Sequence, residues 1–332
     1  MNNKKTEISN GVKYYLGIDV GSISTKFVLV DEESKILFAS YFRTDGNPIE
    51  AIKKGLKGLE EYILKTNPSI EIAGVGTTGS ARYLAGVITG ADLIKNEISA
   101  HAKGVTHSVP ETKTVIEIGG QDSKIIILEN GVVVDFAMNL ICAAGTGSFL
   151  DAQAFRMGVP IEQFGEIALK SKSPTVVSSR CTVFCESDMI HKQQIGHSRE
   201  DIIAGLCQGL ARNFLNNVGK GKNIKPPIVF LGGVSENLGM RKAFSDVLGE
   251  KVIVPENNTV MGALGAALLA KKDKPEKTKF RGFEISSRDI KCTSFICRDC
   301  PNLCEVIEAK IEQKVVARWN DRCGKYSNLK YD

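Results

Sequence analysis

The sequence lacks a long apolar run, an apolar leader and an excess of either charge. No stretch approaches the roughly 20 apolar residues that a membrane helix needs, and the polar start MNNKKTEISN has no apolar signal-peptide core. We therefore expect a cytoplasmic protein. The 43 basic and 38 acidic residues are spread along 332 positions, a balance too even to predict a nucleic-acid-binding face.

Disulfides are not expected either, although the chain holds nine cysteines. A reducing cytosol keeps thiols free, so these cysteines indicate metal or redox chemistry. Four lie in the middle of the chain and five near its end: Cys142, Cys181, Cys185 and Cys207, then Cys292, Cys297, Cys300, Cys304 and Cys323.

The apolar patterns predict an α/β protein with an internal repeat. Residues 14–30 are typical of two strands joined by a Gly/Ser turn, and residues 50–66 have helical spacing. A second hairpin follows at 114–134, where Asn130 and Gly131 provide a tight turn. The repeat predicts two similar subdomains, each with a glycine-rich hairpin facing a shared cleft.

The end of the core is predicted from a change in composition. A helix of small residues over 261–270 closes it, and the charged stretch that follows contains proline and has nothing to bury, which is typical of a linker. The predicted limits are a polar tail 1–13, subdomain I 14–110, subdomain II 111–270, a linker 271–282 and a Cys-rich appendage 283–332.

The turn of the first hairpin carries the residue types of a phosphate site. Glycine lets backbone N–H groups approach phosphate oxygens, hydroxyls and a lysine add donors, and a carboxylate can hold Mg²⁺ through water. An ordinary Gly-Ser hairpin turn is the alternative. The candidates are Asp19 for the metal and Gly21, Ser22, Ser24, Thr25 and Lys26 for the nucleotide.

The second hairpin repeats this design. Gly119 and Gly120 form its turn, Asp122 supplies a second acid, and Gln121 is a candidate to orient the attacking water. The pair of hairpins is a stronger signal than either alone.

A third glycine-rich element follows an apolar strand within 226–234. Bare backbone lets a flat base approach there, although a tight strand-to-helix turn has the same pattern. The order of these elements over residues 14–270 resembles the superfamily of acetate and sugar kinases, Hsp70 and actin. That implies an α/β fold of two RNase H-like subdomains around a nucleotide cleft. The nucleotide candidates here are Gly232, Gly233, Glu236, Asn237 and, in the final helix, Gly262.

Two cysteines each precede a predicted helix. Cys142 leads through Ala-Ala-Gly-Thr-Gly into one helix, and Cys181 introduces another. The free N–H groups and the dipole at a helix N-terminus favour a thiolate or an anionic cluster and tune its reduction potential. Two buried structural cysteines are the alternative.

Five motifs carry a more specific resemblance. In order they are LGIDVGSISTK, IEIGGQDSK, NLICAAGTGSFLD, SRCTVFCESD and LGGVSEN. They resemble the ATPase activators of 2-hydroxyacyl-CoA dehydratases and the ATPase subunits of benzoyl-CoA reductases. The resemblance implies that Cys142 and Cys181 bind a [4Fe-4S] cluster. Such a cluster takes four cysteines, so a symmetric homodimer with the cluster on its axis supplies them.

The resemblance also implies an activity. ATP and Mg²⁺ would bind in each cleft, a ferredoxin or flavodoxin would reduce the cluster, and hydrolysis would drive one electron onto an iron–sulfur partner. Gly145, Thr146 and Gly147 would bridge phosphate and cluster, so that the nucleotide changes the exposure and potential of the cluster. The candidate partners are 2-hydroxyacyl-CoA dehydratases, benzoyl-CoA reductases and double-cubane cluster proteins.

Other cysteines and histidines of the core have less specific interpretations. Cys185 stands where dehydratase activators usually have alanine, and we expect it to be a spare buried thiol. Cys207 is expected to pack in a helix core, and His191 and His197 to lie on a solvated face.

The appendage has the spacing of a metal site. Cys297, Cys300 and Cys304 form C-x2-C-x3-C, Cys323 is a distant fourth sulfur, and Cys292 could replace one of them. A structural Zn²⁺ and a second [4Fe-4S] cluster both fit. Simple dehydratase activators lack this tail, which slightly favours a reductase of a double-cubane protein.

Two other functions compete with electron transfer. A small-molecule kinase of the same superfamily would need a substrate-binding acid or loop, and would not need Cys142 or Cys181. A non-enzymatic nucleotide-gated regulator or metal-binding scaffold would turn over ATP slowly, without response to an electron donor.

Overall fold

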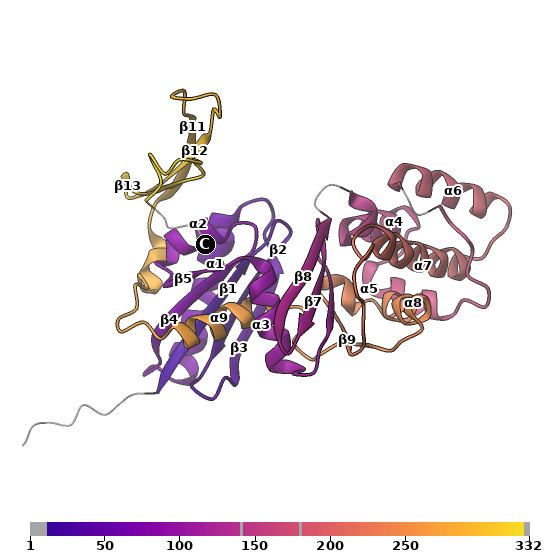
Figure 1. Cartoon of the computed structure of the whole chain (residues 1–332), viewed down its shortest axis with the longest axis horizontal. Helices are drawn as coiled ribbons and strands as arrows, with labels where there is room; N and C mark the ends of the chain where they lie inside the picture. The colour runs from indigo at the N-terminus through magenta and orange to yellow at the C-terminus, as the bar shows by residue number, and fades with distance from the viewer. Residues whose placement is uncertain (1–11, 140–141, 179–180, 329–332) are drawn as a thin grey trace, which may run out of the picture. The chain divides into compact units, whose positions relative to one another are not determined.

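The computed structural model describes residues 12–139, 142–178 and 181–328 (Figure 1). It contains two compact units. Of these residues, the first unit comprises 12–21, Thr25–Asn96 and 266–328; the second comprises Ser22–Ser24 and the described part of Glu97–Gly265. These units do not follow the predicted limits one for one, because residues 97–110 join the second unit and the chain from residue 266 returns to the first.

The first unit contains a five-stranded sheet of order β3-β2-β1-β4-β5. β2 and β3 extend β1 as a meander, and β4 and β5 continue the sheet in parallel on the other side of β1. Its strands are β1 (Lys13–Val20), β2 (Ser24–Val30), β3 (Ile36–Arg43), β4 (Glu71–Thr78) and β5 (Leu93–Ile94). Its helices are α1 (Pro48–Thr66) and α2 (Arg82–Thr89), joined by the later part of α9 (Met261–Asp273).

The sequence of α1 shows how this unit forms its core. The side chain of Asn47 accepts a hydrogen bond from the backbone of Glu50 (3.2 Å) and so caps the helix start. Ile52, Leu56 and Leu59 recur every three or four residues and are fully buried against the sheet. This stripe holds α1 on the unit's apolar core.

The second unit repeats the sheet of the first. Its order is β10-β9-β6-β7-β8, with an antiparallel β6-β7-β8 meander and parallel β9 and β10. The strands are β6 (Thr114–Ile118), β7 (Ser123–Glu129), β8 (Val132–Asn139), β9 (Ile228–Leu231) and β10 (Val252–Ile253). The predicted internal repeat is therefore present as two sheets of the same topology.

Helices and short 3₁₀ segments complete the second unit, and many of their apolar residues lie in one buried cluster with β6, β7 and β9. The helices are α3 (Glu97–Ser108), α4 (Gly147–Arg156), α5 (Ile161–Leu169), α6 (Thr182–Gln194), α7 (Arg199–Asn217) and α8 (Leu238–Leu248). The 3₁₀ segments are η1 (Ala143–Gly145) and η2 (Gly233–Glu236).

The stretch after α9 is hydrogen-bonded to other parts of the first unit. The carboxylate of Asp92 accepts hydrogen bonds from the Thr278 hydroxyl (2.7 Å) and the Lys279 backbone (2.7 Å). The Arg281 backbone then donates to Thr89 (2.9 Å) at the end of α2. The predicted linker thus has defined contacts, which its charged composition did not indicate.

The appendage is a small antiparallel sheet of order β11-β12-β13, preceded by the 3₁₀ segment η3 (Phe283–Ser287) (Figure 1). Its strands are β11 (Ile290–Ile296), β12 (Glu305–Ile311) and β13 (Lys314–Trp319). Ala309, Ala317 and Trp319 pack on Val87 of α2 in a separate apolar cluster.

No helix in the described part of the chain is long and apolar enough to cross a membrane.

Candidate nucleotide and cluster site

The first predicted phosphate turn lies at the end of the β1–β2 hairpin. Asp19 is buried opposite Lys26, and its Oδ2 lies 3.2 Å from the Lys26 Nζ. The Thr44 hydroxyl lies 2.9 Å from the hydroxyl of Thr25 and donates to the carbonyl of Gly21 at 2.9 Å. In this way Thr44 fixes the turn of the hairpin.

The two serines of that turn belong to the second compact unit. Ser22 is exposed and Ser24 is buried.

The second hairpin repeats this acid–lysine pair, and its lysine lies within ion-pair distance of three carboxylates. Glu117 lies opposite Lys124 in the ladder, as Asp19 lies opposite Lys26. The Lys124 Nζ lies 2.7 Å from Glu97, 2.8 Å from Glu117 and 3.0 Å from Asp122.

These contacts keep Lys124 charged. Its side chain is only 2% exposed, and burial alone would lower the pKa of its ammonium group. Attraction to Glu117, Glu97 and Asp122 overrides burial and raises that pKa far above its ordinary value. The lysine therefore forms ion pairs with all three carboxylates, including the predicted catalytic Asp122, while Gln121 is exposed at the turn.

The segment after Cys142 is hydrogen-bonded to this second turn. The backbone of Gly147 donates to Gly119 (2.8 Å), and that of Ser148 donates to Gly120 (2.9 Å). A Cβ on Gly147 would lie 3.0 Å from the Gly119 carbonyl oxygen, so glycine permits the close approach. The predicted cluster segment and the predicted phosphate turn thus form one backbone network.

The residues between Cys142 and Gly147 are fixed within the segment. The Thr146 hydroxyl donates to Ala143 (2.7 Å), and Gly145 is buried beside Asn139. Asn139 accepts from the Cys142 backbone (3.0 Å) and donates to the Cys142 carbonyl (2.8 Å). These bonds fix the backbone that carries the first thiol.

Both predicted cluster cysteines are half-buried and occupy N-cap positions. Cys142 precedes η1, and Cys181 precedes α6. Cys181 directly precedes α6, and Cys142 leads through the short turn η1 into α4, as the sequence predicted for both. Cys185 lies one turn after Cys181 and is buried, as expected for a spare thiol, and burial raises its pKa to about 12.

The remaining interpretations of core residues are confirmed by burial and exposure. Cys207 is buried in α7, and His191 and His197 are exposed.

The third glycine-rich element lies against β6. Gly232 has φ +83°, and a Cβ there would lie 2.3 Å from the Ile118 carbonyl oxygen, so only glycine fits. Asn237 accepts a hydrogen bond from the Met240 backbone (3.1 Å) as the cap of α8. The side-chain amide of Asn258 donates a hydrogen bond to the carboxylate of Glu236.

The other two glycines of this group differ in exposure. Gly233 is exposed, whereas Gly262 is buried within α9.

Two buried hydroxyls near these elements have no hydrogen-bond partner in the described structure. Ser123 Oγ lies at the start of β7 beside Gly145, and Thr78 Oγ1 lies at the end of β4, opposite Asp19 in the ladder. A buried hydroxyl without a partner is unfavourable, which makes it suited to a bound polar group.

The predicted metal ligands do not form a preassembled site. Within the described ranges, no three His, Cys, Asp or Glu side chains come together closely enough to hold a metal ion. Of the appendage thiols, Cys297 is buried, Cys304 is half-buried, and Cys300 and Cys323 are exposed.

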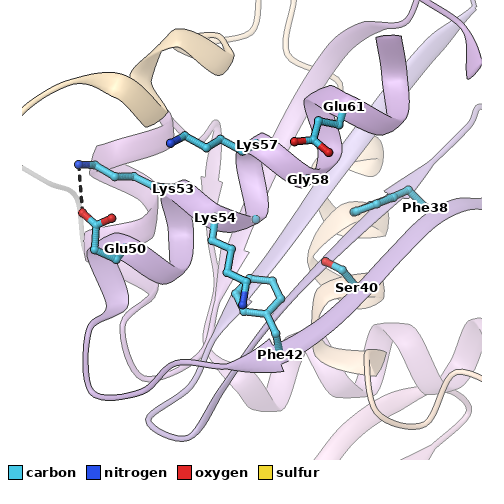
Figure 2. A pocket seen from close by; sticks show the side chains of 10 residues that line it. Phe38, Ser40, Phe42, Glu50, Lys53, Lys54, Lys57, Gly58 and Glu61 are labelled. Atoms are coloured by element: carbon cyan, nitrogen blue, oxygen red, sulfur yellow. Dashed lines mark ion pairs between the residues drawn. The ribbon is translucent and has the colours of Figure 1, made fainter. Parts of the chain in front are cut away.

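A separate hollow of about 530 Å³ lies between β3 and α1 (Figure 2). Phe38 and Phe42 form one wall, Lys54 lies 4.9 Å over the Phe42 ring, and Lys53 pairs with Glu50 at 3.1 Å. None of the predicted nucleotide or metal residues lines it.

Lys124 and Glu97 were missed as site residues by sequence reasoning. The lysine was visible as a repeat of Lys26, but nothing in the local pattern connects it with Glu97 at the start of α3.

The two sheets of equal topology, together with the glycine-rich turns at their strand ends, define a nucleotide-binding protein of the actin and sugar-kinase fold. Residues 16–270 match the BadF/BadG/BcrA/BcrD ATPase family, and the chain belongs to this family.

Two relatives are similar over nearly their whole length. The chain is 34% identical over 267 residues to the 2-hydroxyisocaproyl-CoA dehydratase activator of Clostridioides difficile, covering 80% of this chain and 98% of that protein. It is 37% identical over 266 residues to the (R)-2-hydroxyglutaryl-CoA dehydratase activating ATPase of Acidaminococcus fermentans, covering 78% and 97%.

Solved structures agree with this assignment. The Clostridium difficile activator with bound ADPNP has a TM-score of 0.71 at 34% identity, covering 79% of this chain and 96% of that one. Component A of the Acidaminococcus fermentans dehydratase has a TM-score of 0.73 at 35% identity, covering 79% and 98%. Both the fold and the family predicted from the sequence are confirmed.

Proposed function

We propose that this chain is an ATPase that drives one-electron transfer onto an iron–sulfur enzyme. It acts as a homodimer in which Cys142 and Cys181 of both copies hold one [4Fe-4S] cluster, reduced by a ferredoxin or flavodoxin. The acceptor belongs to the class served by its relatives, the 2-hydroxyacyl-CoA dehydratases and benzoyl-CoA reductases, or is a double-cubane cluster protein.

The backbone link between Gly147–Ser148 and Gly119–Gly120 is the observation that carries this proposal. Nucleotide phosphates bind glycine-rich turns through backbone N–H groups, and here such a turn is hydrogen-bonded to the segment that follows Cys142. A shift of the turn on ATP binding or hydrolysis moves that segment directly. Coupling then needs no long path between nucleotide and cluster.

The nucleotide role rests on both hairpins and on a relative that binds ADPNP. Asp19 in the first hairpin and Asp122 in the second are each proposed to bind Mg²⁺ through water, and Gln121 to orient the attacking water. The unpaired hydroxyl of Ser123 donates to a phosphate oxygen. Lys124 is a positioning residue, because it holds the Asp122 carboxylate by an ion pair (3.0 Å).

The cluster role rests on the two N-cap thiols and the surface beside them. A [4Fe-4S] cluster supplies a one-electron carrier at low potential when bound. Each thiol lies at an N-cap position, where free backbone N–H groups suit a bound anionic cluster. Val183 and Phe184, in the first turn of α6 after Cys181 and Thr182, are 63% and 67% exposed, and Phe155 of α4 is 87% exposed. Such exposed apolar groups on α4 and α6, the helices that follow the two thiols, suit burial against a second copy.

Metal analysis with matched cysteine variants tests this function. Wild type, Cys142→Ser, Cys181→Ser and the exposed control Cys292→Ser are purified anaerobically and assayed for iron and sulfide. We expect about four irons per two chains in the wild type and the control, and loss of iron in the other two. Equal iron in all four proteins, or none in the wild type, would contradict the proposal.

A further inference from the structure

The appendage brings four cysteines to one end of its sheet. β11 ends at Ile296, β12 begins at Glu305 and β13 ends at Trp319, and the three strands are antiparallel neighbours. Their connections at that end are the loop 297–304 and the segment 320–328. The loop carries Cys297, Cys300 and Cys304, and the segment carries Cys323. Thus strand order brings the two segments that carry these cysteines, which span 27 positions, to one end of the sheet.

Cys297 and Cys304 lie opposite each other just beyond the paired ends of β11 and β12. The Cys297 backbone donates to Cys304 at 2.8 Å, which continues the register of Ile296 with Glu305. Residues opposite each other in a sheet share one face, with Cβ atoms about 4.5–5.5 Å apart. In a tetrahedral zinc site with Zn–S bonds of about 2.3 Å, sulfurs lie about 3.8 Å apart. Both sulfurs can therefore reach one ion without opening the hairpin.

The segment that carries Cys323 is held against the loop. Asn320 donates to the Glu305 carbonyl (2.9 Å), and the Tyr326 hydroxyl donates to Asp299 in the loop (3.4 Å). The Tyr326 ring packs edge-on against Phe295 with centroids 5.2 Å apart. These contacts keep the fourth thiol at the same end of the sheet as the other three.

Apolar packing contributes little at this end. The appendage's own apolar cluster, with Ala309, Ala317 and Trp319, lies against α2. Around the loop, Ile296 and Leu303 are 50% and 57% exposed. A three-stranded sheet with so small a core gains stability from a bound metal.

Cys292 is excluded from this group by its register. Cys292 lies on β11 opposite Ala309, and Cys297, which follows the end of β11, is five positions later. Five positions of strand span about 17 Å, and an odd number places the two side chains on opposite faces. The sequence alone left Cys292 as a possible ligand, whereas the strand order provides it as a matched control.

We propose that Cys297, Cys300, Cys304 and Cys323 bind one Zn²⁺ ion, which joins the loop 297–304 to the segment after β13. The Cys297 and Cys323 sulfurs lie 3.4 Å and 3.9 Å from the carboxylates of Asp299 and Asp321. On metal binding the thiols lose their protons and turn from these carboxylates to the ion. This site uses none of the residues proposed for the nucleotide or the bridging cluster.

Zinc and iron analysis of the full chain tests this site. Wild type, Cys300→Ser, Cys323→Ser, Cys292→Ser and Cys142→Ser are purified anaerobically. We expect about one zinc per chain in the wild type, Cys292→Ser and Cys142→Ser, and loss of zinc in Cys300→Ser and Cys323→Ser without loss of iron. Retention of zinc in both of these variants, or its absence from the wild type, overturns the proposal.

A chelation experiment on the wild type avoids dependence on variants that fail to fold. Removing zinc with a chelator is expected to release about one ion and to make about four thiols reactive toward a thiol reagent. If Cys300→Ser and Cys323→Ser lose iron and sulfide instead of zinc, the appendage holds an iron–sulfur cluster and the zinc assignment is wrong. Loss of iron in Cys142→Ser with zinc retained separates this site from the bridging cluster.

Discussion

Lys124 forms ion pairs with three carboxylates that come from separate places in the sequence. Glu117 and Asp122 flank the glycine turn and could be recognised in the motif. Glu97 begins α3, and its approach to Lys124 at 2.7 Å results from how α3 packs on the second sheet. A local pattern cannot predict such a contact, because it depends on tertiary packing.

Replacing this lysine is expected to destabilise the fold strongly. Lys124→Met leaves Glu97, Glu117 and Asp122 without their cation, and breaking a buried ion pair in this way costs about 3–5 kcal/mol. The measurement is urea unfolding of anaerobically purified protein. The control Lys242→Met removes an exposed pair with Asp246 and should cost about 1 kcal/mol or less. Equal losses in both variants would contradict the buried network.

The pH dependence of this contribution has a defined sign. The pKa of Lys124 is raised in the folded protein above its ordinary value of 10.5. Its stabilisation is therefore fully present below that ordinary value and is lost only as the pH rises through the higher folded value. The difference in unfolding free energy between wild type and Lys124→Met should stay constant from about pH 7 to pH 10. A steady decline over that range would contradict the assignment.

Ser123→Ala is expected to separate nucleotide binding from stability. Removing a buried hydroxyl without a partner should leave the unfolding free energy unchanged or raise it. If that hydroxyl donates to phosphate, ATP should bind about five- to tenfold more weakly, as measured by calorimetry. Ser40 of β3 also has a buried, unpaired hydroxyl, so Ser40→Ala serves as the control with unchanged affinity. Unchanged affinity in Ser123→Ala would remove it from the phosphate site.

At the scale of elements, the link between the second turn and the segment 143–148 depends on Gly147. A methyl group there would lie 3.0 Å from the Gly119 oxygen and 3.1 Å from Val234. Gly147→Ala should therefore loosen the segment and raise the ATP hydrolysed per electron transferred, measured anaerobically with a reduced donor and an acceptor enzyme. Gly58→Ala, with open space at its Cβ on α1, should leave that ratio unchanged. An unchanged ratio in Gly147→Ala would show that the link does not couple the two activities.

Elements with strong local signals were predicted well. Asn130 and Gly131 have φ of 50° and 76°, so the expected hairpin turn is confirmed, and α1 covers the predicted helical stretch. The three strands of the appendage were not predicted, because their pairing is set by contacts between strands. The attachment at Asp92 was missed because its partners lie 186 and 187 residues away.

At the scale of the whole molecule, the exposed apolar residues of α6 are expected to form the dimer contact. Phe184→Asp places a charge beside Cys181 and should yield monomers that lack iron, as measured by sedimentation velocity with parallel iron analysis. Leu64→Asp, at a 63% exposed position of α1, should remain a dimer with a full cluster. A dimeric, iron-loaded Phe184→Asp protein would place the subunit contact elsewhere.

The repeat of two sheets could be inferred from the two hairpins, and the family from five motifs that lie in the turns and helix starts. The four-cysteine shell of the proposed cluster is different, because one chain would contribute only Cys142 and Cys181. Its two-copy arrangement was expected from the family resemblance alone, since no residue spacing within one chain indicates it.

Electron paramagnetic resonance of the dithionite-reduced protein tests the coupling of nucleotide and cluster most directly. Spectra are recorded anaerobically without nucleotide, with MgADP and with a non-hydrolysable MgATP analogue. We predict a [4Fe-4S] signal that changes between the two nucleotides in the wild type, is absent in Cys142→Ser and no longer responds in Gly147→Ala. A signal that is identical with and without nucleotide in the wild type would contradict the central claim.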